Sequence, residues 1–274
     1  WFFKAGAHKN ALQYWPSPFH SPLVESGQGF PGWHIECSAM SKKYLGITVD
    51  LHMGGVEHIP VHHTNEIAQS ESANGVKFVN YWLHNEHLLV DNKKMAKSSG
   101  TSYNLADIKD KGFTALALRY FFLQAHYRSK QNFTWEAIQA AQNGLNHLHR
   151  QIQDLAPVRR GSINADFKNK FLEAVSDDFN TPQALAVAQE ILKSELSAKE
   201  KLTTILDFDK VLGLDLASAL EKEKIPAEIK KLIKDREKAR QNKNWAEADK
   251  IREEIEKQGY TVKDTKEGQR IVKQ

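Results

Sequence analysis

A cysteine, a histidine and a glutamate in the first quarter of the chain are spaced so that they could hold one metal ion. His62 and Glu66 stand four residues apart, which places both side chains on one face of a helix. Cys37 lies 25 residues earlier, near the start of another expected helix, and the fold could bring it to the same place. Thiolate, imidazole and carboxylate all bind zinc, and three protein ligands leave one position open for water, substrate or a fourth ligand. The pattern predicts a substrate-binding zinc site, although a cysteine in the core would show the same spacing.

Two lysines flank a short turn further along the chain. Residues 94–100 read KMAKSSG, so Lys94 and Lys97 follow a strand-rich stretch and precede a glycine. Flexible lysines near the edge of a sheet can neutralise a triphosphate while charge develops at the reacting phosphorus. A solvent-exposed basic loop has the same composition, so the segment alone does not decide between the two.

An aromatic side chain and several histidines surround the predicted metal ligands in the sequence. They are Trp33, His34, His52, His58 and His63. An indole beside a metal-bound sulfur could shape a small pocket. The alternative is that Trp33 belongs to the core and that the histidines are structural, and for His58 and His63 we favour that structural interpretation.

The elements that must position these residues form an α/β arrangement. A strand at 49–53 runs into Gly54-Gly55, and a helix from His62 to about Ala73 follows. A strand that ends in a glycine pair just before a helix is typical of the ligand-binding edge of an α/β sheet. The neighbouring expected elements are a helix at 33–45, one or two strands at 79–90 and a lysine-rich loop at 91–100.

Helices are expected for nearly all of the chain after residue 105. The apolar spacing predicts helices at 116–124 and 135–155 and several more within 165–223. A break at 178–182 allows Asn180 or Thr181 to cap a helix with Pro182 in its first turn. After a linker at 225–226, a charged helix pair is expected at 228–258, and a small hairpin opens at Gly259.

Composition places the chain among ordinary globular proteins. It has 274 residues, 41% hydrophobic and 26% charged, and no apolar run long enough to span a membrane. The single cysteine excludes an internal disulfide and fits a reducing cytosol, so a cytoplasmic protein is expected. The chain starts at Trp1 instead of Met, which suggests processing, cleavage or a fragment.

The charge of the chain is concentrated at its C-terminal end. Residues 226–274 hold fourteen basic and ten acidic residues, a net charge of +4 that equals the formal net charge of the whole chain. A basic terminal module suggests a polyanionic partner, above all a nucleic acid. A solvated helix laced with salt bridges has a similar composition.

Several of these segments, in this order, resemble cysteinyl-tRNA synthetases, which are class I aminoacyl-tRNA synthetases. The resemblance extends from about Phe2 to the end of the chain and includes the loop that reads KMSKS in class I enzymes. The similar segments are 31–40 (PGWHIECSAM), 52–55 (HMGG), 62–70 (HHTNEIAQS), 94–98, 177–182 (DDFNTP), 244–249 and 262–265.

The resemblance implies a role for each candidate residue around the metal. Cys37, His62 and Glu66 fall on three of the family's four zinc-ligand positions, and the substrate cysteine binds the zinc through its thiolate. Zinc binds thiolate far better than hydroxyl or methyl groups, so serine could be rejected without an editing site. Trp33 would line the substrate pocket and His52 would support it.

The resemblance also implies the other substrates. Lys97, with Lys94 beside it, would contact the phosphates of ATP, used with Mg²⁺, as the carboxylate of L-cysteine attacks the α-phosphorus. The cysteinyl group then passes to tRNA(Cys), and a monomer is expected. The residues that would meet anticodon bases are Arg240, Trp245, Asp249 and Asp264.

The implied fold class is α/β followed by mostly α. The second half of a class I Rossmann-type catalytic domain precedes a helical bundle and a small α+β anticodon-binding module. The expected domains are the end of a connective insertion (1–32), the second half of the catalytic domain with the KMSKS-like loop (33–105), a stem-contact region (106–160), the helical bundle (161–225) and the anticodon module (226–274).

Departures from the family pattern limit these expectations. Ala96 replaces a serine in the lysine loop, Met53 differs from the common form, and 116–119 keeps only part of an Asp-Ala-Leu-Arg sequence. The family's first zinc-ligand cysteine and its HIGH motif have no counterpart in residues 1–30. The chain alone is therefore expected not to activate cysteine and to bind zinc weakly.

Three alternative functions remain open. A free-standing tRNA-binding module could descend from a synthetase, because ancestry of a fold does not guarantee activity. A ligase that joins cysteine to an amino sugar in mycothiol synthesis would share the zinc and lysine motifs but would not need the basic tail. A zinc hydrolase built on His62, His63 and Glu66 would explain neither the lysine loop nor the tail.

Overall fold

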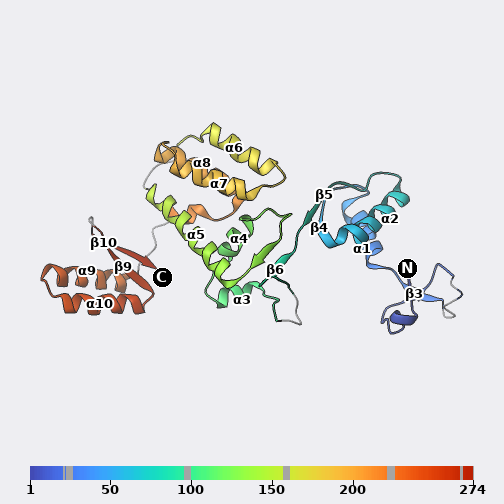
Figure 1. Cartoon of the computed structure of the whole chain (residues 1–274), viewed down its shortest axis with the longest axis horizontal. Coiled ribbons are helices and arrows are strands. Elements are labelled where there is room, and N and C mark those ends of the chain that lie inside the picture. Colours follow the sequence, from blue (N-terminus) through green and yellow to red (C-terminus); the bar gives the residue numbers. More distant parts are fainter. Residues whose placement is uncertain are drawn as a thin grey trace. The chain divides into compact units, whose positions relative to one another are not determined.

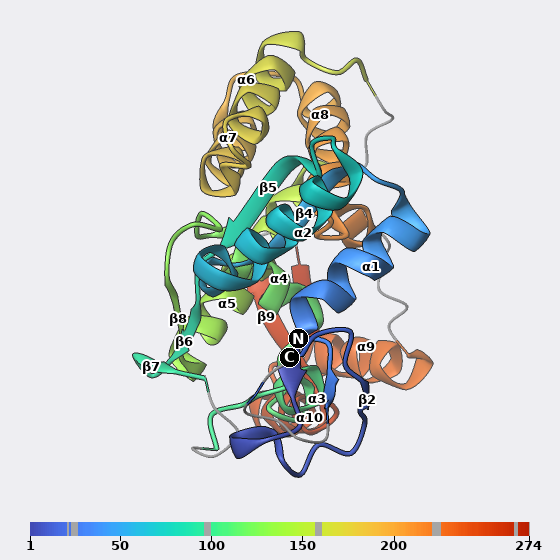
Figure 2. The same cartoon turned by 90° about the vertical axis from the view of Figure 1, so that its right-hand side faces the viewer.

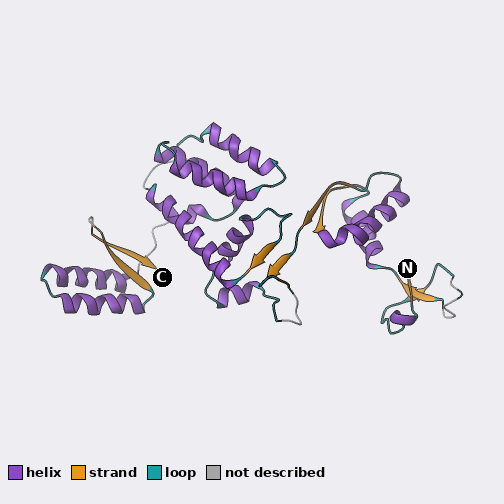
Figure 3. Cartoon of the chain, in the orientation of Figure 1, coloured by secondary structure: helices purple, strands orange, loops and turns teal. Residues whose placement is uncertain are grey.

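The computed structural model describes residues 1–20, 22, 27–95, 100–156, 161–220, 226–265 and 268–273. The chain divides into two compact units, Trp1–Ala219 and Leu220–Gln274. Helices predominate in both units, and each unit also contains short strands (Figure 3). None of the helices in the described ranges is both long enough and apolar enough to cross a membrane.

The first unit opens with three short strands. β1 (Phe2–Phe3), β2 (Trp15–Pro16) and β3 (Gln28–Phe30) form an antiparallel sheet in the order β1-β3-β2. Gly29 has no room for a side chain, because a Cβ there would collide with the Trp1 ring and the Phe2 carbonyl. Gly32 then ends this segment and is the N-cap of α1 (Trp33–Leu45), the helix expected at 33–45.

A parallel pair of strands supports the candidate site. β4 (Val49–Gly55) pairs with β5 (Val79–Asn85) in the register Val49↔Val79 to Gly55↔Asn85. Val49, Phe78 and Val79 are buried together, and Trp82 packs against them. The crossover between the strands carries a 3-10 turn (Val56–His58), a π-helical turn (Ile59–His63) and α2 (Thr64–Asn74). Helix α2 contacts α1, and the two lie side by side in Figure 2.

The α-helix that the sequence predicts from His62 starts two residues later in the structure. The α-helix begins at Thr64, and His62 and His63 lie in the wider π turn, which has Pro60 near its start. A π turn adds one residue to the turn and is frequently found at functional sites. It therefore rotates the two histidines relative to an uninterrupted α-helix while leaving both buried.

The lysine-rich loop expected at 91–100 is also corrected, at its start. β6 (Leu88–Val90) and β7 (Lys93–Lys94) form an antiparallel hairpin, and β6 pairs in parallel with β8 (Gln131–Phe133). Asp91 and Asn92 have φ values of 49° and 61°, as two-residue hairpin turns require. Lys94 is therefore on a short strand.

Helices make up the rest of the first unit, as the apolar spacing predicted. α3 (Leu105–Asp110), α4 (Ala115–Leu123) and α5 (Trp135–Asp154) precede α6 (Ala165–Ser176), α7 (Thr181–Lys193), α8 (Ala198–Leu212) and a 3-10 turn (Leu216–Leu220). Asn180 caps α7 by accepting from the Gln183 N–H, with Pro182 in the first turn. Phe171 and Phe208 stack with ring centroids 4.2 Å apart between α6 and α8.

The second unit is a helix pair with a hairpin. α9 (Ala227–Gln241) and α10 (Trp245–Lys257) precede the antiparallel strands β9 (Tyr260–Thr265) and β10 (Gly268–Lys273), all labelled in Figure 1. Its core comprises Ile251, Ile255 and Val262, with Leu232, Ile233 and Tyr260 packed around them. The helix pair and the hairpin were both expected from the sequence.

Candidate metal and substrate site

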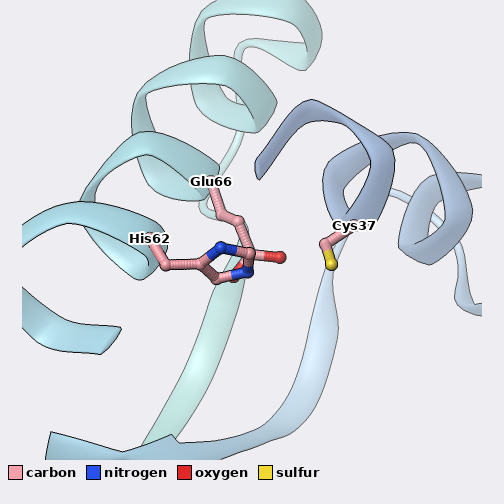
Figure 4. Close-up of side chains that lie close together, drawn as sticks. All are labelled: Cys37, His62 and Glu66. Atoms are coloured by element: carbon pink, nitrogen blue, oxygen red, sulfur yellow. The ribbon is translucent and has the colours of Figure 1, made fainter. Parts of the chain in front are cut away.

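The three predicted metal ligands meet in the folded chain. One ligand atom from each of Cys37, His62 and Glu66 lies within 4.8 Å of the others. Cys37 extends from α1, while His62 and Glu66 come from the π turn and α2 (Figure 4). His62 and Glu66 are buried and Cys37 is half-buried, so the group has one side open toward solvent.

The Glu66 carboxylate is the centre of this region. One of its oxygens, Oε2, lies 3.0 Å from His52 Nε2, 3.7 Å from His62 Nε2 and 3.9 Å from His63 Nε2. The other, Oε1, is buried without a hydrogen-bond partner. An unpaired buried carboxylate oxygen costs stability. A bound cation would remove that cost, so the unpaired oxygen fits a metal ligand.

Trp33 is half exposed and contacts His62, so it is not the core residue of the alternative interpretation. Its indole Nε1–H donates to His62 Nε2 at 2.9 Å, and the two ring centroids are 4.4 Å apart. The other nitrogen of His62, Nδ1, lies 2.8 Å from His34 Nδ1. A metal ion bound to His62 Nε2 would use the lone pair that accepts this hydrogen bond, so the indole N–H would have to give up its contact with Nε2.

Burial favours the neutral forms of the candidate ligands in the absence of a cation. Burial raises the pKa of the Cys37 thiol, and the nearby carboxylates Glu66 and Glu36 add to the effect. Burial lowers the pKa of His62, with His34 contributing next. Burial also raises the pKa of Glu66, although the neighbouring His52 opposes it. A bound divalent cation reverses this balance, because it favours thiolate and carboxylate.

His52 supports the site from the strand below it. It lies on β4, and its Nε2 shares a proton with Glu66 Oε2 across 3.0 Å. Its ring packs edge-on against Trp82 on β5, with centroids 4.8 Å apart. The strand pair thus helps to fix the orientation of the glutamate through His52.

The structure describes one of the two predicted lysines, Lys94, and the backbone positions of the predicted tRNA-contacting residues. Lys94 is exposed on β7, and Lys97 lies outside the described residues. Trp245 is 56% exposed at the start of α10, with the Arg240 guanidinium 5.9 Å from its ring centroid. Asp249 is exposed on α10, and Asp264 is on β9 with a side chain that the structure does not describe.

Sequence reasoning missed a polar cluster around Asp178. Asp178 accepts from the Tyr127 hydroxyl at 2.6 Å and pairs with Arg128 at 2.9 Å, and its carbonyl lies 2.9 Å from His126 Nε2. Asp178 and Phe179 have φ values of 51° and 57°, strained for residues with side chains. The signal in the sequence is the helix break at 178–182, which predicts a capping site and does not by itself predict this cluster.

A pocket of about 570 Å³ lies next to this cluster. Its lining is mostly apolar and includes Leu51, Met53 and Leu83 from the strand pair, Phe122 from α4, and Tyr127 and Phe179. The pocket therefore connects the carboxyl end of β4 and β5 with the corner that precedes α7. Ligands of open α/β sheets bind at that end of the strands.

Three family descriptions match consecutive parts of the chain. The catalytic domain of class I (C) tRNA synthetases matches residues 3–143, slightly more than half of the chain. The DALR domain matches 170–217, and the anticodon binding domain of cysteinyl-tRNA ligase matches 222–271.

Individual proteins agree with these matches. The chain is 45% identical to cysteine–tRNA ligase 1 of Burkholderia lata, over 94% of this chain and 53% of that protein. It is 40% identical to the cysteine–tRNA ligase of Protochlamydia amoebophila, over 95% and 57%. The chain thus spans about half the length of the curated relatives it matches.

A solved structure shares the fold. The LeuRS of Agrobacterium radiobacter K84, in a ternary complex with tRNA and LeuAMS, superposes with a TM-score of 0.50 at 15% identity, over 64% of this chain and 28% of that one. The expected fold class, an α/β part of a class I synthetase followed by helices, is confirmed. Catalytic, helical and anticodon-binding parts occur in family order, and the chain belongs to the cysteinyl-tRNA synthetases.

Proposed function

We propose that this chain is part of a cysteine–tRNA ligase, which activates L-cysteine with ATP and transfers the cysteinyl group to tRNA(Cys). The observation that carries the proposal is the meeting of Cys37, His62 and Glu66 beside the unpaired Glu66 Oε1. A soft thiolate, an imidazole and a carboxylate suit Zn²⁺ better than Mg²⁺ or Ca²⁺. The family match supports cysteine as the substrate of such a site.

In this proposal, different side chains have different roles in cysteine recognition. Cys37, His62 and Glu66 would hold Zn²⁺, which supplies a Lewis acid that accepts a thiolate in preference to a hydroxyl group. Trp33 would form a wall of the substrate pocket, and the contact of its half-exposed indole with His62 supports this role. His52 holds the Glu66 carboxylate in place through its hydrogen bond. Such a site rejects serine by chemistry instead of by size.

Activation of the carboxylate would use the lysine segment. In this proposal Lys97 contacts the phosphates of ATP, with Mg²⁺, and Lys94 adds positive charge beside it. Their charge stabilises the transition state as the cysteine carboxylate attacks the α-phosphorus and pyrophosphate leaves. The exposure of Lys94 on β7 leaves its ammonium free to reach an anionic ligand.

The second unit would read the anticodon. An exposed indole can stack on a base, and carboxylates accept hydrogen bonds from exocyclic amines. Trp245 and Asp249 are exposed on the same helix, and Arg240 lies beside the indole. Together with Asp264 they form the proposed contact surface. The match of residues 222–271 to an anticodon binding domain supports tRNA, and not an amino sugar, as the acceptor.

The test is amino-acid-dependent exchange of pyrophosphate into ATP by the protein in which this chain occurs. Cysteine is expected to support exchange and serine is not, and tRNA(Cys) is expected to accept the product. Cys37→Ser is expected to lower kcat/KM for cysteine by about 100-fold or more, since a metal ligand is lost. His87→Gln, outside the ligand group, is the matched control. Exchange that is equal for cysteine and serine would contradict the proposal.

A further inference from the structure

A second set of donor atoms also includes the Glu66 carboxylate. One ligand atom from each of His52, His63 and Glu66 lies within 4.8 Å of the others. The distances to Glu66 Oε2 are 3.0 Å from His52 Nε2 and 3.9 Å from His63 Nε2. His63 and Glu66 are buried and His52 is half-buried, so water competes little for these donors. None of the three is Cys37 or His62.

The ring of His63 is held in an orientation that suits a ligand. Its Nδ1 lies 2.7 Å from His84 Nε2, so one proton joins the two rings. When that proton is on His63 Nδ1, the lone pair on Nε2 faces Glu66. A histidine that binds a metal through one nitrogen typically donates from the other. His58 stacks on the same ring at 5.3 Å and Trp82 packs on it at 4.7 Å, which limits its rotation.

The backbone of β4 is shaped around this ring. A Cβ on Gly54 would lie 2.5 Å from His63 Cε1 and 2.9 Å from His63 Nε2. Only a glycine therefore allows the strand to approach the imidazole as closely as it does. The absence of a side chain leaves Nε2 accessible between the strand and the glutamate.

We propose that His52, His63 and Glu66 form a second transition-metal site that shares Glu66 with the first. Two imidazoles and one carboxylate suit Zn²⁺, Co²⁺ and Ni²⁺. The sharing of Glu66 rests on the proposed function, because the first site is that of Cys37 and His62. Two cations beside one carboxylate repel each other, so the second ion binds more weakly than the first.

Titration of the metal-free chain with Co²⁺ distinguishes the two sites. Only a site that includes Cys37 gives the thiolate-to-cobalt charge-transfer band in the near ultraviolet, whereas the histidine set gives d–d bands alone. The wild type is expected to bind two equivalents, the first of which gives the charge-transfer band. His63→Gln is expected to lose the second equivalent and keep that band, and Cys37→Ser is expected to lose the band and keep one equivalent.

Controls make the outcome decisive. His87→Gln removes a histidine that, among the described residues, lies within ion-pair distance only of Glu57 and Glu86, and the variant is expected to bind cobalt as the wild type does. Gly54→Ala, judged folded by circular dichroism, is expected to lose the second equivalent as His63→Gln does. The proposal would be overturned if His63→Gln and Gly54→Ala both bound two equivalents of Co²⁺. It would also be overturned if the wild type bound a single equivalent that gave the charge-transfer band. A different result would contradict the proposed function while leaving the second site standing. In that result the wild type binds cobalt without the charge-transfer band, and His63→Gln abolishes the binding.

Discussion

Glu66 combines two properties that conflict in a residue with a purely structural role. It is fully buried, and one of its carboxylate oxygens has no partner. Burial raises its pKa, so the environment disfavours the charged form. A carboxylate that is retained although its burial destabilises the fold fits a residue selected for binding.

Replacement of Glu66 by glutamine separates stability from binding. In the metal-free chain, Glu66→Gln is expected to leave the free energy of unfolding at pH 7 unchanged or to raise it by up to about 1 kcal/mol, because no charge remains buried. The affinity for zinc is expected to fall by about 100-fold, since a neutral amide oxygen is a poorer ligand. Thermal unfolding with a chelator and zinc competition with a chromophoric chelator measure the two effects. Lower stability with unchanged zinc affinity would assign Glu66 a structural role instead.

At this scale the sequence predicts that Cys37, His62 and Glu66 lie together, as they do, but it does not predict their full surroundings. The i, i+4 spacing of His62 and Glu66 is local, so it was readable from the sequence. The bond between Tyr127 and Asp178 spans 51 positions and depends on tertiary packing. The contact of Trp33 with His62, across 29 positions, is of the same kind.

At the scale of elements, one arginine ties two helices together. Arg119 on α4 donates from Nε to the Leu212 carbonyl at 2.5 Å, at the C-terminal end of α8. The guanidinium satisfies a carbonyl left unpaired at the helix end and complements the negative end of the helix dipole.

Loss of this contact is expected to destabilise the first unit. Arg119→Met should lower the free energy of unfolding by about 1.5–3 kcal/mol, the value of hydrogen bonds to a charged donor. Lys170→Met removes an exposed ion pair with Glu190 and should cost less than about 1 kcal/mol. Urea unfolding followed by circular dichroism measures both, and equal effects for the two variants would refute a special role for Arg119.

An ion pair between helices gives the first unit a pH dependence. Asp207 on α8 pairs with Lys210 at 2.6 Å and with Lys168 of α6 at 3.1 Å. These lysines, Lys210 first, lower the pKa of the carboxyl group below its unfolded value. The stabilisation is therefore complete above about pH 4 and is lost as the pH falls through the folded pKa.

Asp207→Asn tests this dependence. The variant is expected to be less stable than the wild type by about 0.5–1.5 kcal/mol at pH 7. The difference should shrink below about pH 4 and disappear at lower pH, where the carboxyl group is protonated in both states. Urea unfolding at a series of pH values provides the measurement. A difference that stays constant down to pH 2 would exclude the ion pairs as its cause.

Elements were predictable where the pattern is local. The helix expected at 33–45 coincides with α1, and the strand expected at 49–53 extends to Gly55. The π turn was not predicted, because its hydrogen bonding differs from an α-helix by a single residue. β7 was missed because only two residue pairs join it to β6, too few to leave a periodic pattern.

At the scale of the whole molecule, the residues proposed for cysteine recognition and those proposed for anticodon recognition lie in different units. The predicted zinc ligands all belong to Trp1–Ala219, and the predicted anticodon contacts all belong to Leu220–Gln274. A variant in one unit should therefore leave the function of the other intact.

Trp245→Ala is the corresponding test. It is expected to weaken binding of tRNA(Cys) by about tenfold or more, because one stacked base contributes about 1–3 kcal/mol. Zinc affinity should not change. Tyr44→Ala removes another exposed aromatic ring, on α1, and should bind tRNA as the wild type does. Filter binding at fixed ionic strength measures the effect, and wild-type affinity in Trp245→Ala would remove this indole from the contact surface.

Recognition of cysteine by a metal-bound thiolate is testable on the chain itself. Equilibrium dialysis of the zinc-loaded chain against radiolabelled cysteine and serine compares the two ligands, which differ only in sulfur and oxygen. Cysteine is expected to bind at least about 100-fold more tightly than serine, and Cys37→Ser is expected to abolish the difference. Equal binding of the two amino acids by a chain that holds zinc, or a preference that survives Cys37→Ser, would contradict thiolate recognition at this site.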